Sequence, residues 1–94
     1  MPVTITIPTP LRQFAGGKSR IDVEATTAGE ALERLTAQYA ELRRHLYNDQ
    51  NALRSFVNIY LNDEDIRYLK NVETAVKESD EVSIVPSIAG GTNL

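Results

Sequence analysis

The feature that most limits the fold of this chain is one amphipathic helix set between two groups of alternating strands. In the middle of the sequence, apolar side chains recur at spacings of three and four residues, which gives one stripe along a helix. The stripe consists of Leu32, Leu35, Tyr39, Leu42 and Leu46. Thr27 and Glu30 stand three residues apart before it, the spacing of a capping box at a helix start. The pattern does not place the end of the helix, since the stripe can continue past a break.

Segments that alternate between apolar and polar residues flank this helix, as half-buried strands do. The predicted strands are 3–7, 19–24, 56–61, 66–68 and 81–85. The first two are separated by prolines and by Gly16-Gly17, which predicts a hairpin. Between the later strands, 62–65 is predicted to be a turn and 72–77 a short helical turn or loop.

One long helix with four or five strands packs most economically across one face of a mixed sheet. A crossover that contains the helix separates the terminal strands, so these strands can pair in parallel at the centre. The prediction is therefore an α+β domain with the β-grasp arrangement over 1–86, followed by a flexible tail over 87–94. The residues assigned to its core are Val3, Ile5, Ile7, Leu32, Leu35, Val57, Ile59, Val82 and Ile84.

Composition excludes several classes of function. The net charge is −3, and no cluster of Lys and Arg indicates a nucleic-acid partner. No long apolar stretch or secretory leader is visible, so we expect no membrane partner and a cytoplasmic location. The chain has no cysteine, which rules out iron–sulfur ligation, zinc-thiolate sites and a cysteine nucleophile within it.

Few residues suggest catalysis. Asp63-Glu64-Asp65 is a carboxylate cluster, but we interpret it as a solvated turn because no histidine is fixed opposite it. His45, the sole histidine, is interpreted as a helix-end residue. There is no phosphate-binding loop and no nucleophile elbow. The prediction is a protein with no catalytic residues and no metal site, on which another protein performs any chemistry.

The end of the chain carries the strongest functional signal. The last predicted strand stops at Pro86, which lacks the N–H that a sheet ladder needs. Gly90 and Gly91 follow, and a backbone without Cβ atoms can enter a channel too narrow for side chains. A chain can in this way offer its own main-chain carboxylate as a substrate. Gly16-Gly17 shows that such a pair is weak alone, and a frayed terminus remains the alternative.

Three stretches, 3–12, 56–67 and 80–91, give the chain a resemblance to a known family. The most specific parts are the run Val-Asn-Ile-Tyr-x-Asn-Asp-Glu-Asp at 57–65 and the ending Pro-x-Ile-Ala-Gly-Gly at 86–91. Together they resemble the bacterial sulfur carriers of the ThiS and MoaD type, which are ubiquitin-like β-grasp domains. Within that family the resemblance is greatest to carriers of cysteine biosynthesis.

The resemblance implies a cycle of reactions at the tail. An adenylyltransferase and sulfurtransferase of the ubiquitin-activating type would adenylate the Gly91 carboxylate with ATP, and Gly90 would let it enter the site. Sulfide or a persulfide would then replace AMP. The resulting thiocarboxylate would donate sulfur to a synthase similar to cysteine synthase. The chain itself would bind no cofactor, because the activating enzyme uses the ATP.

Two positions depart from the family pattern. Ser79 stands where members commonly have glycine, and serine is tolerable in a turn. Mature carriers end at the second glycine, whereas this sequence continues through Thr92-Asn93-Leu94. Three residues displace the carboxylate by roughly 10 Å, so we predict cleavage after Gly91. The resemblance implies a zinc-dependent, JAMM-type metallopeptidase for this step, since such an enzyme does comparable trimming in related systems. A harmless extension is the alternative.

Val85 is predicted to contact the activating enzyme, together with Ile88 and Ala89 of the tail. It lies out of phase with the core residues Val82 and Ile84, on the sheet face away from the helix.

Other functions remain open at this point. The chain could carry sulfur for molybdopterin or thiazole synthesis, act as a ubiquitin-like modifier that forms isopeptide conjugates, or be an interaction domain with an inert tail.

Overall fold

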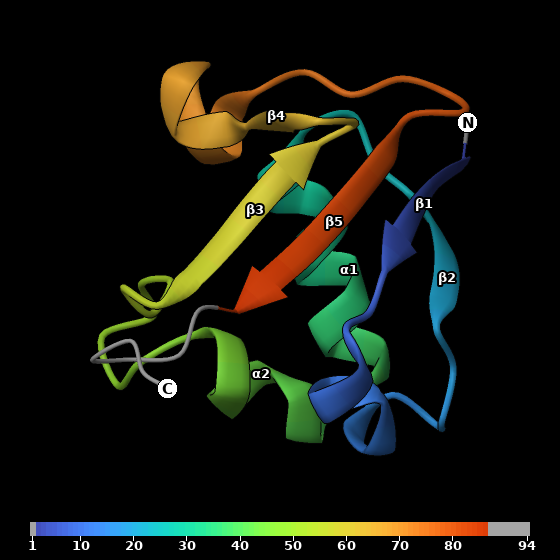
Figure 1. Cartoon of the computed structure of the whole chain (residues 1–94), viewed down its shortest axis with the longest axis vertical. Coiled ribbons are helices and arrows are strands. Elements are labelled where there is room, and N and C mark those ends of the chain that lie inside the picture. The colour runs from blue at the N-terminus through green and yellow to red at the C-terminus, as the bar shows by residue number, and fades with distance from the viewer. Residues whose placement is uncertain (1, 87–94) are drawn as a thin grey trace.

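The computed structural model describes residues 2–86, which form a five-stranded sheet with helices packed on one face (Figure 1). The strand order is β2-β1-β5-β3-β4. The strands are β1 (Pro2–Thr6), β2 (Arg20–Glu24), β3 (Val57–Leu61), β4 (Glu64–Asp65) and β5 (Glu81–Pro86). The helices are α1 (Ala28–Gln38) and α2 (Ala40–Leu46), with 3-10 turns at Thr9–Phe14, Ile66–Tyr68 and Asn71–Glu73. This is the predicted β-grasp arrangement.

The two terminal strands lie side by side at the centre of the sheet (Figure 1). β1 and β5 are parallel, with Ile5 opposite Val82, while β5 and β3 are antiparallel, with Ile84 opposite Ile59. These four side chains point to the helix-covered face and are at most 3% exposed. All nine residues assigned to the core from the sequence are buried, and Leu61 is partly buried against it.

The capping box predicted for the first helix is confirmed with one change. Thr27 Oγ1 accepts a hydrogen bond from the Glu30 backbone N–H at 3.1 Å. The Glu30 carboxylate accepts from the backbone N–H of Thr26 at 2.7 Å, one residue before the cap. The first bond satisfies a donor that the first helical turn leaves without a partner, and the second ties the residue before the cap to that turn.

The apolar stripe spans two helices, because the helix breaks at Tyr39. Thr36, one turn earlier, is buried, and its hydroxyl donates to the carbonyls of Leu32 or Glu33 at 3.0 and 3.2 Å. Such bonds from a side chain to the preceding turn weaken a helix and often bend it. The Tyr39 ring lies against Gly16, in the connection between β1 and β2. Leu42 and Leu46 still reach the core from α2.

The prediction for 62–68 was wrong in detail. The strand lies at Glu64–Asp65, inside the predicted turn, and the expected strand 66–68 is a 3-10 turn. Asn62 adopts a positive φ of 58°, so Asn62 and Asp63 alone reverse the chain. Asp65 then accepts a hydrogen bond from the backbone N–H of Arg67 and ends the strand.

Two further segments contain short helical turns. The connection between β1 and β2 includes the 3-10 turn Thr9–Phe14, with Pro10 in its first turn. The segment 72–77, predicted as a helical turn or loop, begins within the 3-10 turn Asn71–Glu73 and then runs extended, with a bridge between Ala75 and Thr27.

Within residues 2–86, neither helix has the length and apolar character that crossing a membrane requires.

Ser79 occupies the position where the family pattern has glycine, and its φ is 78°. L-residues are disfavoured there because of their Cβ atom, whereas glycine is not. We therefore expect Ser79→Gly to raise the free energy of unfolding by about 0.5–1 kcal/mol, the strain relieved exceeding the added freedom of the unfolded chain. Urea denaturation measures the change.

Glu78→Gly is the matched control for this substitution, because Glu78 is the exposed neighbour with no positive φ. There glycine only adds freedom to the unfolded chain, so stability should fall. A loss of stability in both variants would mean that Ser79 is not strained.

Candidate functional site

β5 fixes the place from which the tail leaves the domain. This strand is hydrogen-bonded to β1 along one edge and to β3 along the other. Its last residue, Pro86, is also the last residue that the structure describes, and it lies opposite Val57 at the start of β3. The root of the tail is therefore held against β3, at the end of the central strand.

The beginning of β5 is tied to its neighbours by polar contacts. Asn62 bonds twice to Glu81, with its backbone N–H donating to the carbonyl at 2.7 Å and its side-chain oxygen accepting from the N–H at 3.1 Å. The Glu81 carboxylate accepts a hydrogen bond from Thr6 Oγ1 on β1. These bonds fix where β5 begins.

Val85 lies on the sheet face opposite the helices, as the sequence predicted. It is 42% exposed and sits across from Asn58 of β3, while Ser83 sits across from Tyr60. Val85 borders a hollow of about 250 Å³ lined by Tyr60, Asn62, Asp63 and Ser83. An exposed valine beside such a hollow can contact a partner protein without changing the core.

A second group of residues surrounds the root of the tail, and the sequence analysis did not find it. A hollow of about 370 Å³ is lined by Leu11, Arg44, His45, Arg54, Phe56 and Pro86. Arg54 Nε donates to the Arg44 carbonyl at 3.0 Å, which holds the two arginines together. The only signal was the pair Arg43-Arg44, which also suits the end of a helix.

His45 is part of this region and lies near the end of α2, as predicted. Its ring stacks on Phe14, with ring centroids 4.0 Å apart. Its Nε2 atom is buried and has no hydrogen-bond partner among the described residues. The ring therefore has an aromatic contact on one side and basic neighbours around it.

The carboxylate cluster 63–65 is not a uniformly solvated turn. Asp65 is only 6% exposed, and its carboxylate accepts from Nε and from Nη2 of Arg67, the latter at 2.7 Å. These bonds, with the Arg67 backbone N–H, hold the Asp65 pKa below its usual value. Asp63 and Glu64 are exposed. The sequence missed this pair because a two-residue strand between turns has no periodicity.

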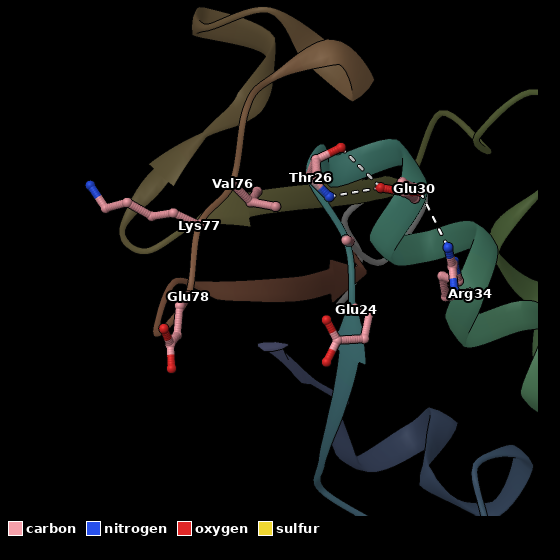
Figure 2. Close-up of a pocket in the computed structure, with 8 residues that line it drawn as sticks. Glu24, Thr26, Glu30, Arg34, Val76, Lys77 and Glu78 are labelled. Atoms are coloured by element: carbon pink, nitrogen blue, oxygen red, sulfur yellow. Dashed lines mark hydrogen bonds and ion pairs between the residues drawn. The ribbon is translucent and has the colours of Figure 1, made fainter. Parts of the chain in front are cut away.

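A hollow of about 470 Å³ lies where the end of β2, the start of α1 and the segment 76–78 meet (Figure 2). Three carboxylates line it, those of Glu24, Glu30 and Glu78. Glu30 bonds to Thr26 and forms an ion pair with Arg34 at 3.5 Å, and the Thr26 backbone N–H lowers its pKa. Among residues 2–86, no three His, Cys, Asp or Glu side chains are grouped to hold a metal ion.

The tail residues predicted to contact the activating enzyme, to react or to be cleaved off lie outside the described residues. They are Ile88, Ala89, Gly90, Gly91, Thr92, Asn93 and Leu94. Their roles stay predictions. The described part of the site consists of Val85, the hollow beside it and the basic hollow at Pro86.

Comparison with protein families gives a match to the ThiS family over residues 5–91. The chain belongs to the ThiS family. The match spans the described domain and extends through the tail to Gly91.

The matches to relatives of this ThiS-family chain span most or all of both chains, and a solved structure shares its fold. The sulfur carrier protein CysO of Mycobacterium tuberculosis is 39% identical over 93 residues, covering 97% of this chain and 100% of the relative. The small archaeal modifier protein 3 of Haloferax volcanii is 35% identical, covering 85% of this chain and 88% of the relative. A crystal structure of a BexX/CysO complex from Amycolatopsis orientalis matches with a TM-score of 0.84 and 35% identity, covering 95% and 99% of the chains.

These similarities establish a ubiquitin-like β-grasp fold and support a sulfur carrier role for this ThiS-family chain. Small proteins of this kind are generally not enzymes themselves. β5 is the central strand of the sheet, and its last residue, Pro86, leads directly into the tail.

The ion pair between Asp65 and Arg67 gives a pH-dependent prediction. Because the folded state holds the Asp65 pKa below its unfolded value of about 3.9, its stabilisation is present above that pH and is lost as the pH falls through the folded pKa. Asp65→Asn should therefore lower the free energy of unfolding near neutral pH, with a smaller difference at more acidic pH. Urea denaturation between pH 2 and 7 measures it.

Asp63→Asn is the control, since Asp63 is exposed on the same turn. It should change stability by at most about 0.5 kcal/mol near neutral pH. Parallel stability curves for the native chain and Asp65→Asn across the whole pH range would contradict the assigned ion pair.

Proposed function

We propose that this chain carries sulfur as a thiocarboxylate on Gly91. The observation that carries the proposal is the family match, which runs through the strand that anchors the tail and ends at Gly91. The relatives named as sulfur carriers cover nearly the whole chain, which supports the same role for its tail.

The proposed reaction has two steps, both performed by an adenylyltransferase and sulfurtransferase of the ubiquitin-activating type. An oxygen of the Gly91 carboxylate attacks the α-phosphorus of ATP, so that an acyl-phosphate bond forms and pyrophosphate leaves. Sulfide then attacks the acyl carbon, a C–S bond forms and AMP leaves with the oxygen. This chain supplies the carboxylate, and the activating enzyme binds the ATP.

The residues of the domain position the tail in this scheme. β1 and β3 both pair with the first half of β5, and β3 continues to Pro86, five residues before Gly91. Five extended residues reach at most about 16–18 Å, which sets how closely the domain must approach the activating site. Val85, with Ile88 and Ala89, would contact that enzyme, and Gly90 would pass through its channel.

Cysteine biosynthesis is the pathway we favour, with a synthase similar to cysteine synthase as the sulfur acceptor. The support is the 39% identity to the mycobacterial carrier CysO. Molybdopterin and thiazole synthesis are alternatives within the same chemistry. The relative named as a small archaeal modifier favours a second function, in which Gly91 forms isopeptide bonds with lysine side chains. The mass of the product distinguishes the carrier function from the modifier function. A thiocarboxylate differs from the starting chain by one sulfur in place of one oxygen, whereas a conjugate also contains the mass of the target protein.

Removal of Thr92-Asn93-Leu94 is the step we propose before activation, performed by a JAMM-type metallopeptidase. We expect a chain ending at Gly91 to gain the mass change for replacement of oxygen by sulfur when given activating enzyme, ATP and sulfide. The full chain should not react without peptidase, because its carboxylate lies roughly 10 Å too far along the channel. Intact-mass spectrometry compares the two.

Gly91→Ala in the shortened chain is the control for entry of the tail, since a Cβ atom should obstruct a channel shaped for glycine. If the full chain reacts equally well with Leu94 still attached, the processing step and the assignment of Gly91 are both wrong. If lysine conjugates appear instead of the sulfur-containing mass, the modifier function replaces the carrier function.

The proposed interface gives a separate prediction. Val85→Asp should lower the rate of adenylation about tenfold at low carrier concentration, because an unpaired carboxylate would be buried in the interface. The thermal stability should change little, since Val85 is 42% exposed. Pyrophosphate release measures adenylation.

Val72→Asp is the matched control, because Val72 is 41% exposed and lies in the 3-10 turn Asn71–Glu73 rather than on β5. It should leave the rate of adenylation unchanged. Equal losses of activity in the two variants would place the interface elsewhere, and equal losses of stability and activity in Val85→Asp would mean that Val85 is a core residue.

A further inference from the structure

β2 forms one edge of the sheet, and its outer side has no strand partner among the described residues (Figure 1). The N–H of Ile7 donates to the carbonyl of Ser19 at 2.8 Å, so the backbone groups of Ser19 point toward β1. In an antiparallel pair this direction alternates, so those of Ile21 also point inward, whereas those of Arg20 and Asp22 point to the open edge. An open edge of this kind can pair with another strand.

The side chains along this edge carry an ordered set of charges. Arg20, Asp22 and Glu24 stand at alternate positions of β2, Lys18 stands two residues before the strand begins, and all four are exposed. Two positive charges are followed by two negative charges, so the pattern is opposite in sign when it is read in reverse. An antiparallel copy of the same segment therefore presents the complementary sequence of charges.

One register makes every charge pair favourable. When the two-fold axis passes between the Ile21 residues of two copies, Arg20 faces Asp22 of the second copy, and Lys18 faces Glu24. If the two-fold axis instead passes between the Asp22 residues, one position further along the strand, Asp22 faces Asp22 of the second copy. Opposite charges across a strand pair stabilise it and like charges destabilise it, so the pattern selects the first register.

This pairing would leave the existing core unchanged. Ile21 and Val23 are 7% and 8% exposed and remain packed against their own helices. Glu24, which faces Lys18 of the second copy, also lines the hollow that contains Glu30 and Glu78 (Figure 2). The second copy's lysine would therefore approach a hollow with three carboxylates.

We propose that β2 is a self-association edge, through which two copies of this chain pair antiparallel about Ile21. The occupant is a second copy because its own charges match the edge in register. The inference does not depend on the proposed sulfur chemistry, since β5 and Val85 lie beyond β1 from this edge. A pairing of single short strands buries little area, so we expect a weak dimer with a Kd on the order of 0.1–1 mM.

Sedimentation equilibrium of the full chain tests the proposal. At low salt, the weight-average mass should rise from 10.5 kDa toward twice that value as the protein concentration reaches the millimolar range. At 1 M salt, where charges are screened beyond about 3 Å, the Kd should increase at least tenfold. A monomer at every concentration would overturn the proposal and would mean that the charges only protect the edge from pairing.

Two charge reversals test the register. Arg20→Glu places Glu against Asp22, and Asp22→Arg places Arg against Arg20, so each variant alone should be monomeric. An equimolar mixture should form a heterodimer, because both of its central pairs are then attractive. The double variant, with both reversals in one chain, should self-associate like the native chain.

A cooperative thermal unfolding transition checks that each variant is folded. The check matters most for Asp22→Arg, which loses a hydrogen bond from Thr4 Oγ1.

Amide hydrogen exchange on the native chain gives an independent measurement. The amides of Arg20 and Asp22 should become protected as the concentration rises. Exchange independent of concentration, or a mixture of single variants that stays monomeric while the native chain dimerises, would exclude this pairing.

Discussion

The parallel pairing of the first and last strands is the interaction on which the rest of the structure depends. It places β5 in the middle of the sheet, with β1 on one side and β3 on the other. Because the two strands run in the same direction, the chain between them must cross over, and α1 and α2 lie within that crossing. The helices thus cover the inner face, and the core forms between them and β1, β5 and β3.

The same arrangement gives the two faces of the sheet different environments. The inner face is used for stability, with Ile5, Val82 and Ile84 almost completely buried. The outer face carries Val85 and Ser83 next to the root of the tail, where side chains can change without disturbing the core. A ThiS-family domain can therefore keep one fold while its outer face is adapted to different partners.

Much of this architecture follows from local patterns in the sequence. Alternation at Val3–Ile7 and Glu81–Val85, and the stripe from Leu32 to Leu46, were sufficient for the core and the sheet, because burial on one face enforces the periodicity. The helix break at Tyr39 was not placed, since it depends on the buried Thr36 hydroxyl and on a contact with distant Gly16.

The parts of the site that the sequence did not predict depend on contacts between separate segments. Arg44 and Arg54 come together only when the segment between α2 and β3 folds back against the end of α2. The burial of Asp65 depends on Arg67 folding back over a two-residue strand. In both cases the residue types are ordinary surface residues, and only the tertiary arrangement gives them their environment.

The central position of β5 also has a mechanical consequence. A protein that draws the tail into a narrow channel applies force along the axis of this strand. The hydrogen bonds that join β5 to β1 and β3 lie across that axis, so the force loads them in shear and they must break together rather than one after another. An edge strand such as β4, pulled away sideways, would instead peel off bond by bond. The domain can therefore resist a force that a partner applies to the end of the chain better than it could if the tail followed an edge strand.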